Sequence, residues 1–572
     1  MRSAAQRVVL ACTLLMGVSR ASAEDIVDPE DPTAASRTPA PVPETAAPTG
    51  WIGDPEAPGG WIGDPEAPGG WIGDPEAPAG PDPSTGPVTP APAVSAGNAF
   101  RPELTSWRAR YGSSAQTDLQ RQGSGEDTFE LLNEVSLGLS ARISPRWNVT
   151  VDGRLSWWMT SGYAGESSPR ITSPDDWQGR FEGVLRDCHL SGRAGSWIFK
   201  FGNQLVSWGS MDLMSPADVV APRDLRRGIF ADGEESRVAM PAANATWLAD
   251  RLAWQFLLIP FFVPNQQALY GSDFAPLRQG SPLQEQLPVD LLINGVDPSI
   301  EDDLNGALRQ TRRPEELLRN LQPASRLTSS WGGMDLSAGY LYGFDRVPTL
   351  QVADSLVQFG RFAAGRDEPL SLDAATLVAI GPLLEDLESG ATLIDTGYER
   401  THFVTVDGVR YLGPVGLRWE GAWSPSRTAY VEGPGSLRRA WASGAAGLSY
   451  ESEDTIVVTA EVGYTRFFEN SSDPTYLLAT NRQPMYALGA QWWLPVDAWF
   501  RRGWKMSLKA GGTYAAVGRD LAVLPSLEFT TETGWTAEAG VAVFSSFDDN
   551  RATIGDVLDW NDAAFARLER RW

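Results

Sequence analysis

Histidine, cysteine and lysine are almost absent from this chain of 572 residues. It has two histidines and two cysteines, and three of its 47 basic residues are lysines, which leaves 44 arginines. So few imidazoles and thiols exclude the usual zinc sites and a disulfide framework. The 72 acidic residues outnumber the 47 basic ones and give a net charge of −25. This balance excludes most nucleic-acid binders, which need a basic face to neutralise phosphates.

The shortage of histidine also bears on catalysis. His189 and His402 are the only imidazoles that could act as a base, and neither lies within a recognisable serine or aspartate constellation. Cys188 and His189 are adjacent in the sequence, but together they would supply only two metal ligands, which do not make a site. The sequence also has no P-loop, dinucleotide fingerprint or calcium loop of standard spacing. We therefore expect no enzyme activity, no cofactor and no metal site.

The N-terminus carries a short apolar run rather than a membrane anchor. The run from Val8 to Val18 is too short to cross a bilayer as a helix. It follows a basic start and precedes Ala21-Ser22-Ala23, the small residues that a signal peptidase needs. We therefore expect residues 1–23 to be a secretory signal peptide. A lipoprotein cleaved at Cys12 is the alternative, but it would shorten the apolar region further.

Residues 24–100 form a second compositional unit. They hold 17 of the 42 prolines, and their 13 acidic residues against one basic residue give −12. Gly-Trp-Ile-Gly-Asp-Pro-Glu-Ala-Pro occurs three times with a period of ten residues, over about residues 50–80, which places Trp51, Trp61 and Trp71 in register. This composition predicts a disordered periplasmic tail. The repeats are either a spacer or a multivalent ligand whose tryptophans bind a periplasmic partner.

From residue 101 to residue 572 the dominant pattern is alternation of apolar and polar residues. Val149, Val151, Leu155 and Trp157, for example, alternate with polar neighbours. The alternating segments run about ten to twelve residues, close to the nine to eleven that cross a bilayer as a tilted strand. Aromatic residues lie at both ends of several segments, as in the aromatic girdles of membrane barrels. A secreted chain without a long apolar helix can span a membrane only as a closed barrel.

The alternation predicts an all-β fold, an outer-membrane transmembrane β-barrel of about 18 antiparallel strands. The predicted strands are 104–111, 129–142, 146–158, 179–190, 196–206, 241–249, 251–261, 324–331, 334–343, 398–408, 414–424, 438–450, 455–467, 483–493, 503–515, 521–531, 534–545 and 561–572. The weakest of them are 104–111 and 324–331, and without these two the barrel would have 16 strands.

The predicted connections alternate in length. Turns such as 143–145 and 332–333 are short, whereas 112–128, 159–178, 207–240, 262–323 and 344–397 are long. Outer-membrane barrels have this asymmetry, with short periplasmic turns and long external loops. The long loops contain helix-like patterns that could plug or cover the barrel, at Ile300–Gln310, Pro314–Leu321 and Ala374–Leu387.

Two groups of charged residues are candidates for lining a pore. The first lies in the loop 207–240, which is long enough to fold inward and form a constriction: Asp212, Asp218, Arg223, Asp224, Arg226 and Arg227. The alternative is that these side chains cap turns and pair with one another structurally. The second group is predicted to face the lumen from the wall: Asp152, Arg154, Arg418, Glu420, Glu461, Lys505, Lys509 and Glu538. Because its charges are mixed in sign, no ion preference follows.

The same loop carries a resemblance to a known family. Its string Trp208-Gly209, Ser215-Pro216-Ala217-Asp218-Val219 and Pro222-Arg223-Asp224-Leu225-Arg226 resembles uncharacterised porin-like outer-membrane proteins, some of them encoded beside lipid exporters of the resistance-nodulation-division type. The likeness to alginate-export channels is more distant. The resemblance to the porin-like proteins covers roughly residues 101–572, and Asp548-Asp549-Asn550 is its second specific part. It implies a barrel in the outer membrane of a Gram-negative-type bacterium, with the N-terminal tail in the periplasm.

The C-terminus supports this location. Trp572 ends an alternating strand and resembles the signature by which the barrel-assembly machinery recognises bacterial barrels, although Arg570 stands where that pattern prefers an apolar residue. The expected partners are this machinery and outer-membrane lipid. The sequence thus predicts an outer-membrane channel or porin for passive or substrate-selective passage of solutes. The alternatives are an outer-membrane component of an envelope lipid or polymer transport system with periplasmic partners, and a surface adhesion barrel.

Overall fold

The computed structural model describes most of the chain after residue 102. The described residues are 103–119, 129–161, 177–226, 228, 236–266, 320–364, 374–389, 394–431, 435–452, 455–468, 476–477, 482–494, 504–547 and 561–572. The predicted signal peptide and the tail with Trp51, Trp61 and Trp71 lie outside these ranges. So do Arg227, Asp548-Asp549-Asn550, the helix-like pattern at 300–310 and residues 314–319 of the pattern at 314–321.

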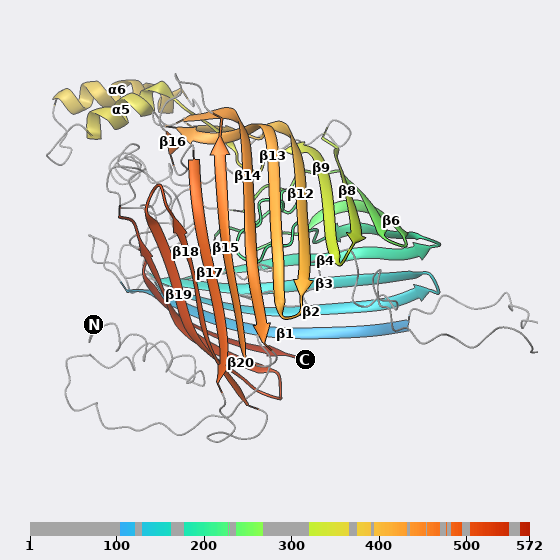
Figure 1. Cartoon of the computed structure of the whole chain (residues 1–572). Coiled ribbons are helices and arrows are strands. Elements are labelled where there is room, and N and C mark those ends of the chain that lie inside the picture. The colour runs from blue at the N-terminus through green and yellow to red at the C-terminus, as the bar shows by residue number, and fades with distance from the viewer. Residues whose placement is uncertain are drawn as a thin grey trace, which may run out of the picture.

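Eighteen long antiparallel strands of the described chain form a closed ring (Figure 1). The strands are β1 (Glu103–Asp118), β2 (Phe129–Ser144), β3 (Trp147–Ser161), β4 (Trp177–Ala194), β5 (Trp197–Gln204), β6 (Met240–Ala249), β7 (Leu252–Ile259), β8 (Gln322–Trp331), β9 (Met334–Phe344), β12 (Arg400–Leu412), β13 (Val415–Val431), β14 (Gly435–Ser452), β15 (Ile456–Phe467), β17 (Arg482–Leu494), β18 (Lys505–Ala515), β19 (Asp520–Thr530), β20 (Trp535–Ser545) and β21 (Ala563–Arg571). Each pairs with its neighbour, and β21 pairs with β1. Three short strands, β10 (Thr349–Val352), β11 (Ile394–Gly397) and β16 (Tyr476–Leu477), extend the sheet.

The ring confirms the prediction of eighteen strands, and the alternative of sixteen is wrong. Both of the weakest predicted strands are part of the wall, since β1 pairs with β2 and β21, and β8 pairs with β7 and β9. The strand β1 has 16 residues and continues into the segment 112–128 that was predicted to be a loop. Alternation weakens there at Gly112, Ser113 and Ser114, where small residues hide the pattern.

The connections define two different rims. Residues 145–146, 195–196, 250–251, 332–333, 413–414 and 531–534 form short turns at one rim, where β1 begins and β21 ends. The connections 205–239, 260–321 and 345–399 join strand ends at the opposite rim, so the predicted asymmetry in length is confirmed there. It is not strict, because the connections 432–434 and 516–519 at this second rim are also short.

Two helices lie at the long-loop rim (Figure 1). They are α5 (Asp354–Ala364) and α6 (Ala374–Glu388), and α6 confirms the helix predicted over Ala374–Leu387. Leu356, Phe359 and Leu383 are buried where the two helices pack together. None of the helices in the described part of the chain is long and apolar enough to cross a membrane.

The wall is apolar outside and polar inside. On β12 the side chains of Val404 and Val406 are exposed, whereas the alternating Thr405 and Asp407 are buried. The same holds for exposed Val135, Leu137 and Leu139 on β2, and for exposed Val462 and Tyr464 on β15. A barrel in water would expose polar side chains and bury apolar ones, so this surface suits a hydrocarbon environment.

The seam of the ring explains the unusual C-terminal arginine. The backbone N–H of Trp572 donates to the carbonyl of Ala109 at 3.0 Å, beyond the last residue of β21. The guanidinium of Arg570 lies 5.1 Å from the Trp535 ring and 4.7 Å from the Trp572 ring. Stacking between two indoles gives this cation favourable contacts at a position where an apolar residue was expected.

Candidate functional site

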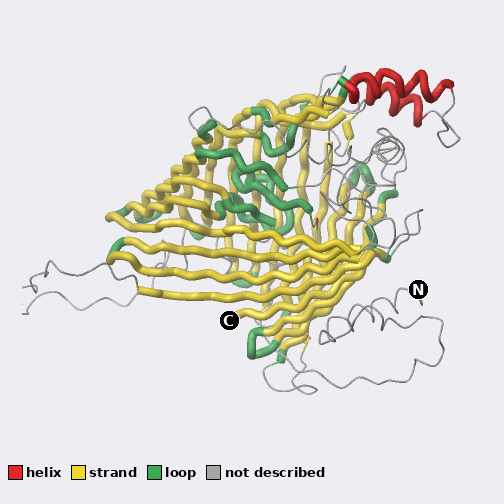
Figure 2. Tube along the Cα trace, turned by 180° about the vertical axis from the view of Figure 1, so that it is seen from behind, coloured by secondary structure: helices red, strands yellow, loops and turns green. Residues whose placement is uncertain are grey.

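The loop between β5 and β6, residues 205–239, crosses the interior of the barrel. Its described residues are hydrogen-bonded to side chains of β13 and β15, which lie six and eight strand pairings round the ring from β5. Figure 2 shows loop segments, in green, lying within the ring of strands. The loop is therefore attached to two distant parts of the wall and occupies part of the lumen.

The first attachment is the carboxylate of Glu420 on β13, which is 3% exposed. It accepts hydrogen bonds from the backbone N–H groups of Ser210, Met211 (2.6 Å) and Ala217 (2.9 Å) and from the hydroxyl of Ser215 (3.0 Å). The loop thus wraps round this one side chain. Hydrogen bonds to an ionised acceptor contribute about 1.5–3 kcal/mol each, so the set holds the loop firmly.

The second attachment is Glu461 on β15, which is also buried. Its carboxylate accepts from three consecutive backbone N–H groups, those of Asp212 (2.9 Å), Leu213 (3.1 Å) and Met214 (2.6 Å). Successive amides that converge on one anion form a nest. The side chain of Asp212 also forms an ion pair with Arg418 of β13. We call Glu420 and Glu461 the carboxylate clamp.

One face of the loop is sealed to the wall by apolar packing. Trp208 is 1% exposed and packs, with Val206 and Val220 of the same loop, against strands β6 to β9 and β12; the wall residues of this cluster are Met240, Ala242, Leu257, Ile259, Ala324, Leu341 and Phe403. The indole Nε1–H donates to Gln255 at 3.1 Å. A Cβ at Gly339 would lie 2.8 Å from the indole, so this glycine provides the space for the ring.

Arg346, which follows β9, ties the loop to a second segment. It is half-buried, and its guanidinium donates to the carbonyl oxygens of Val220 (2.6 Å) and Val263. Burial lowers the pKa of Arg346 to about 10, opposed by the nearby carboxylates of Asp218 and Asp345. The group therefore stays protonated at neutral pH and can make both bonds.

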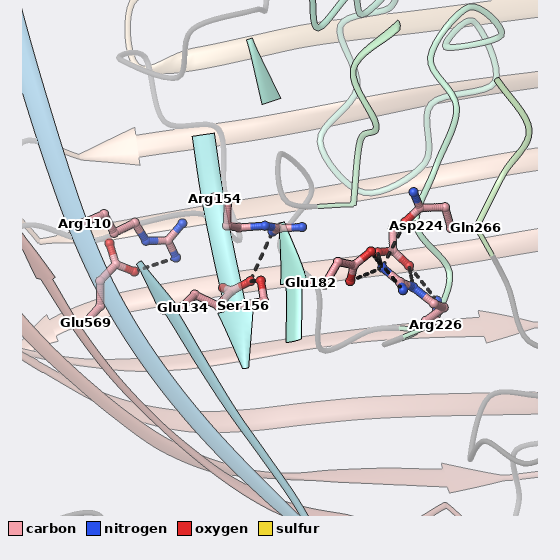
Figure 3. Close-up of polar contacts among 9 residues, drawn as sticks. All are labelled: Arg110, Glu134, Arg154, Ser156, Glu182, Asp224, Arg226, Gln266 and Glu569. Atoms are coloured by element: carbon pink, nitrogen blue, oxygen red, sulfur yellow. Dashed lines mark hydrogen bonds and ion pairs between the residues drawn. The ribbon is translucent and has the colours of Figure 1, made fainter. Parts of the chain in front are cut away.

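The other end of the loop presents charged side chains toward β4 (Figure 3). Arg226 lies between three acceptors: Asp224 (2.6 Å), Glu182 of β4 (3.2 Å) and Gln266 (2.9 Å). Burial raises the pKa of Asp224, but the hydrogen bonds and charge of Arg226, together with the charge of Arg154, outweigh it and hold that pKa below its ordinary value. Asp224 is therefore an anion in the neutral range.

Two further ion pairs continue along the same wall (Figure 3). Arg154 of β3 lies 3.3 Å from Glu134 of β2, and Arg110 of β1 lies 2.9 Å from Glu569 of β21. Arg110 and Arg154, like Arg226, therefore each lie beside at least one carboxylate. This wall is polar and charged, in contrast to the wall that Trp208 covers.

The structure places five of the six loop candidates within polar contacts, and the sixth, Arg227, lies outside the described residues. Asp218 is buried and paired with Arg223 (3.0 Å) and Arg237 (3.2 Å). Asp212, Asp224 and Arg226 contact the wall as described above. These pairs hold the loop inside the barrel, and a pore constriction formed by these residues stays a prediction.

The wall candidates are mostly buried on the inner face. Asp152 pairs with Arg108 at 2.9 Å, and Lys509 pairs with Glu528 at 2.6 Å and with Glu538 at 3.9 Å. Lys505 shares the parity of Lys509 but is exposed at the short-turn rim. The sequence predicted inward positions for Glu420 and Glu461 but not that they bind the loop, since no local pattern links residues about 200 positions apart.

The two histidines do not share a site. His189 faces the interior and contacts Asp187 at 2.7 Å, while His402 lies on the outer face with its Nδ1 2.8 Å from the Tyr340 hydroxyl. Cys188 is a free cysteine. It lies on the opposite face of β4 from His189, where its cross-strand neighbour is the exposed Val151. Within the described ranges, no group of three or more His, Cys, Asp or Glu side chains could hold a metal ion.

No family model matches the chain, and no curated protein sequence matches it. Among solved structures, Pseudomonas aeruginosa OccK5 (OpdH) is 11% identical, with 82% of this chain and 98% of that chain covered and a TM-score of 0.40. Acinetobacter baumannii OccAB1 is 9% identical over 82% and 96%, with a TM-score of 0.43. Salmonella typhi OmpF, in complex with daunomycin, is 8% identical over 81% and 97%, with a TM-score of 0.37. The strand pairings alone establish the barrel fold, because these similarities are too distant to add support for it.

Proposed function

We propose that the chain is an outer-membrane channel through which small polar solutes diffuse along a concentration gradient. The observation that carries the proposal is the carboxylate clamp, which holds residues 210–217 inside a barrel with an apolar exterior. A structural or adhesive barrel has no need for a loop fixed across its interior. In a channel, such a loop reduces the cross-section and selects solutes by size and charge.

The proposed path lies on the polar side of the loop. Packing round Trp208 closes the interior against β6 to β9 and β12. The charged groups at Arg226, Arg154 and Arg110 lie on the opposite side, with the inner faces of β1 to β4 and β21. Solutes would pass between these side chains, which can exchange hydrogen bonds with polar molecules.

Pairing of the charges supports weak ion selectivity. Among the described residues, Arg110 pairs with Glu569 and Arg154 pairs with Glu134, while Arg226 pairs with both Asp224 and Glu182. A paired guanidinium presents little net field to a passing ion. The second carboxylate at Arg226 is offset on the same loop by Asp218, which pairs with two arginines, Arg223 and Arg237. We therefore expect only a weak preference between cations and anions.

Single-channel recording of the full chain in planar bilayers tests the proposal. We expect stepwise currents from the natural protein. Glu420→Gln with Glu461→Gln removes both anions, so the loop loses its strongest attachments; conductance should rise and fluctuate between levels as the loop moves. The matched control is Asp335→Asn, which changes a wall carboxylate at the short-turn rim that accepts a hydrogen bond from Ser330 rather than from the loop.

The outcome that rejects the proposal is a folded barrel, judged by β-type circular dichroism, that gives no current in either form. Equal conductance for the natural protein and the double variant would reject the role of the clamp. The predicted alternative, an envelope transport component with periplasmic partners, depends on the tail repeats and stays a prediction.

A further inference from the structure

Four arginines face outward at the long-loop rim of one side of the barrel, a feature that the channel does not use. Arg400 of β12 shares its parity with the exposed Val404, and Arg438 of β14 shares its parity with the exposed Leu448. Arg466 of β15 and Arg482 of β17 share theirs with the exposed Val462 and Tyr486. Each arginine lies within four residues of the end of its strand at this rim. We call these four residues the arginine row.

Two members of the row oppose one another directly. Arg466 and Arg482 are cross-strand partners in the pairing of β15 with β17, so their like charges lie on the same face of adjacent strands. The Arg466 guanidinium also stacks 4.9 Å from the ring of Phe468, an exposed aromatic.

The other two members are held in place by aromatic rings and backbone carbonyls. The Arg400 guanidinium lies 5.0 Å from the Tyr342 ring and 4.6 Å from the Phe344 ring, and it donates to the carbonyl of Leu321 at 3.0 Å. Arg438 donates to the carbonyl of Arg400 at 2.7 Å and, more weakly, to that of Ser426 at 3.5 Å. Its ion-pair partner is Glu399 at 3.5 Å, a side chain that is 55% exposed.

We propose that the arginine row binds the phosphate groups of a phosphorylated lipid in the membrane leaflet at the long-loop rim. The inference rests on the proposed membrane location, but not on conduction. Three features support a lipid rather than a soluble anion: the row lies on the outer, apolar face of the wall, it follows the rim where headgroups lie, and aromatic rings accompany it. Guanidinium groups suit phosphate because they can donate two parallel hydrogen bonds.

Native mass spectrometry of the detergent-purified full chain tests this proposal, with diphosphorylated lipid A as the probe. The natural protein should retain the lipid, and retention should fall when the lipid's phosphates are removed enzymatically. Arg466→Gln with Arg482→Gln should reduce retention by roughly tenfold or more, since each arginine near a lipid surface contributes a separate attraction. Arg466→Lys with Arg482→Lys should restore part of it. Inorganic phosphate should compete poorly.

The matched control is Arg410→Gln, an outward and exposed arginine at the other end of β12, at the short-turn rim. It should leave retention unchanged. Equal retention by the natural protein and the double variant, or of the lipid with and without phosphates, would overturn the inference. Strong competition by inorganic phosphate would also overturn it, because the site would then take a free anion. The double variant should conduct as the natural protein does, so failure of the channel proposal is seen separately.

Discussion

At the scale of single residues, Gly209 shows how closely the loop and wall fit. Its φ is +103°, in the region that side-chain-bearing residues rarely adopt. A Cβ there would lie 2.5 Å from the Ser215 hydroxyl and 2.6 Å from the Glu420 carboxylate. The backbone therefore approaches the clamp as closely as it does only because this position has no side chain.

Gly209→Ala should consequently loosen the loop. We expect a cost of about 1–3 kcal/mol from the backbone conformation alone, together with displacement of the Glu420 carboxylate. The measurable result is a channel with more frequent current fluctuations, in the same direction as the clamp variant. The control is Gly112→Ala, where a Cβ would meet nothing within 4 Å. Currents as steady as those of the natural protein would show that the loop tolerates the added methyl group.

At the scale of elements, Arg226 joins three parts of the chain that are distant in sequence. It links Asp224 of its own loop with Glu182 of β4 and with Gln266, which follows β7. Two backbone hydrogen bonds between the loop and the segment after β7, Leu225 to Gln266 (2.7 Å) and Gln266 to Arg223 (2.8 Å), support the same junction. The loop position therefore depends on charge balance as well as on packing.

Arg226→Gln should make the junction sensitive to pH. In the natural protein the pKa of Asp224 is depressed, so the stabilisation is present above the ordinary aspartate range and is lost only as pH falls through that lowered pKa. Without Arg226, burial raises the pKa, and Asp224 should take up a proton at a higher pH.

The measurement is the reversal potential of the channel as pH falls from 7 to about 5, a range that lies above the ordinary aspartate pKa. The permeability of cations relative to anions should decline over this range more in the variant than in the natural protein. The double variant Arg226→Gln with Asp224→Asn should not show the extra decline. If it does, another carboxylate, such as Glu182, is responsible.

At the scale of the whole molecule, the ring is completed by the pairing of β21 with β1. Trp572 extends this seam beyond the last strand residue through its backbone bonds with Ala109. The inner face of the seam carries the Arg110–Glu569 pair, and the outer face carries Arg570 between two indoles. Both faces therefore hold the last strand in register.

Deletion of residues 570–572 should weaken the seam more than Trp572→Ala. The deletion removes the backbone bonds with Ala109 and the Arg570 stack, whereas the substitution keeps the backbone; each lost bond costs about 1 kcal/mol. The measurement is the urea concentration at which the refolded barrel unfolds in detergent. Deletion of residues 24–100, which leaves the wall intact, is the control. Equal midpoints for the two C-terminal variants would assign the effect to the indole alone.

The sequence predicted the wall well because strand alternation is local. Most wall strands follow a period of two over much of their length, and even the mixed inner face could be assigned by parity, as with Glu420 and Lys509. The attachments of the loop could not be predicted, because they depend on register round a closed ring. Trp208 illustrates the limit, since its burial depends on the absence of a side chain at Gly339, on a strand that comes much later in the chain.

The carboxylate clamp also constrains the order of events during biogenesis. The amide of Ser210 precedes its acceptor by 210 residues, and that of Met214 precedes its acceptor by 247. Newly translocated polypeptide thus presents these donors long before either glutamate has emerged. Until the later hairpins are inserted, water must solvate these amides. The loop can bind Glu420 and Glu461 only after most of the barrel wall has formed. Attachment of the loop to the clamp is therefore one of the last steps of folding.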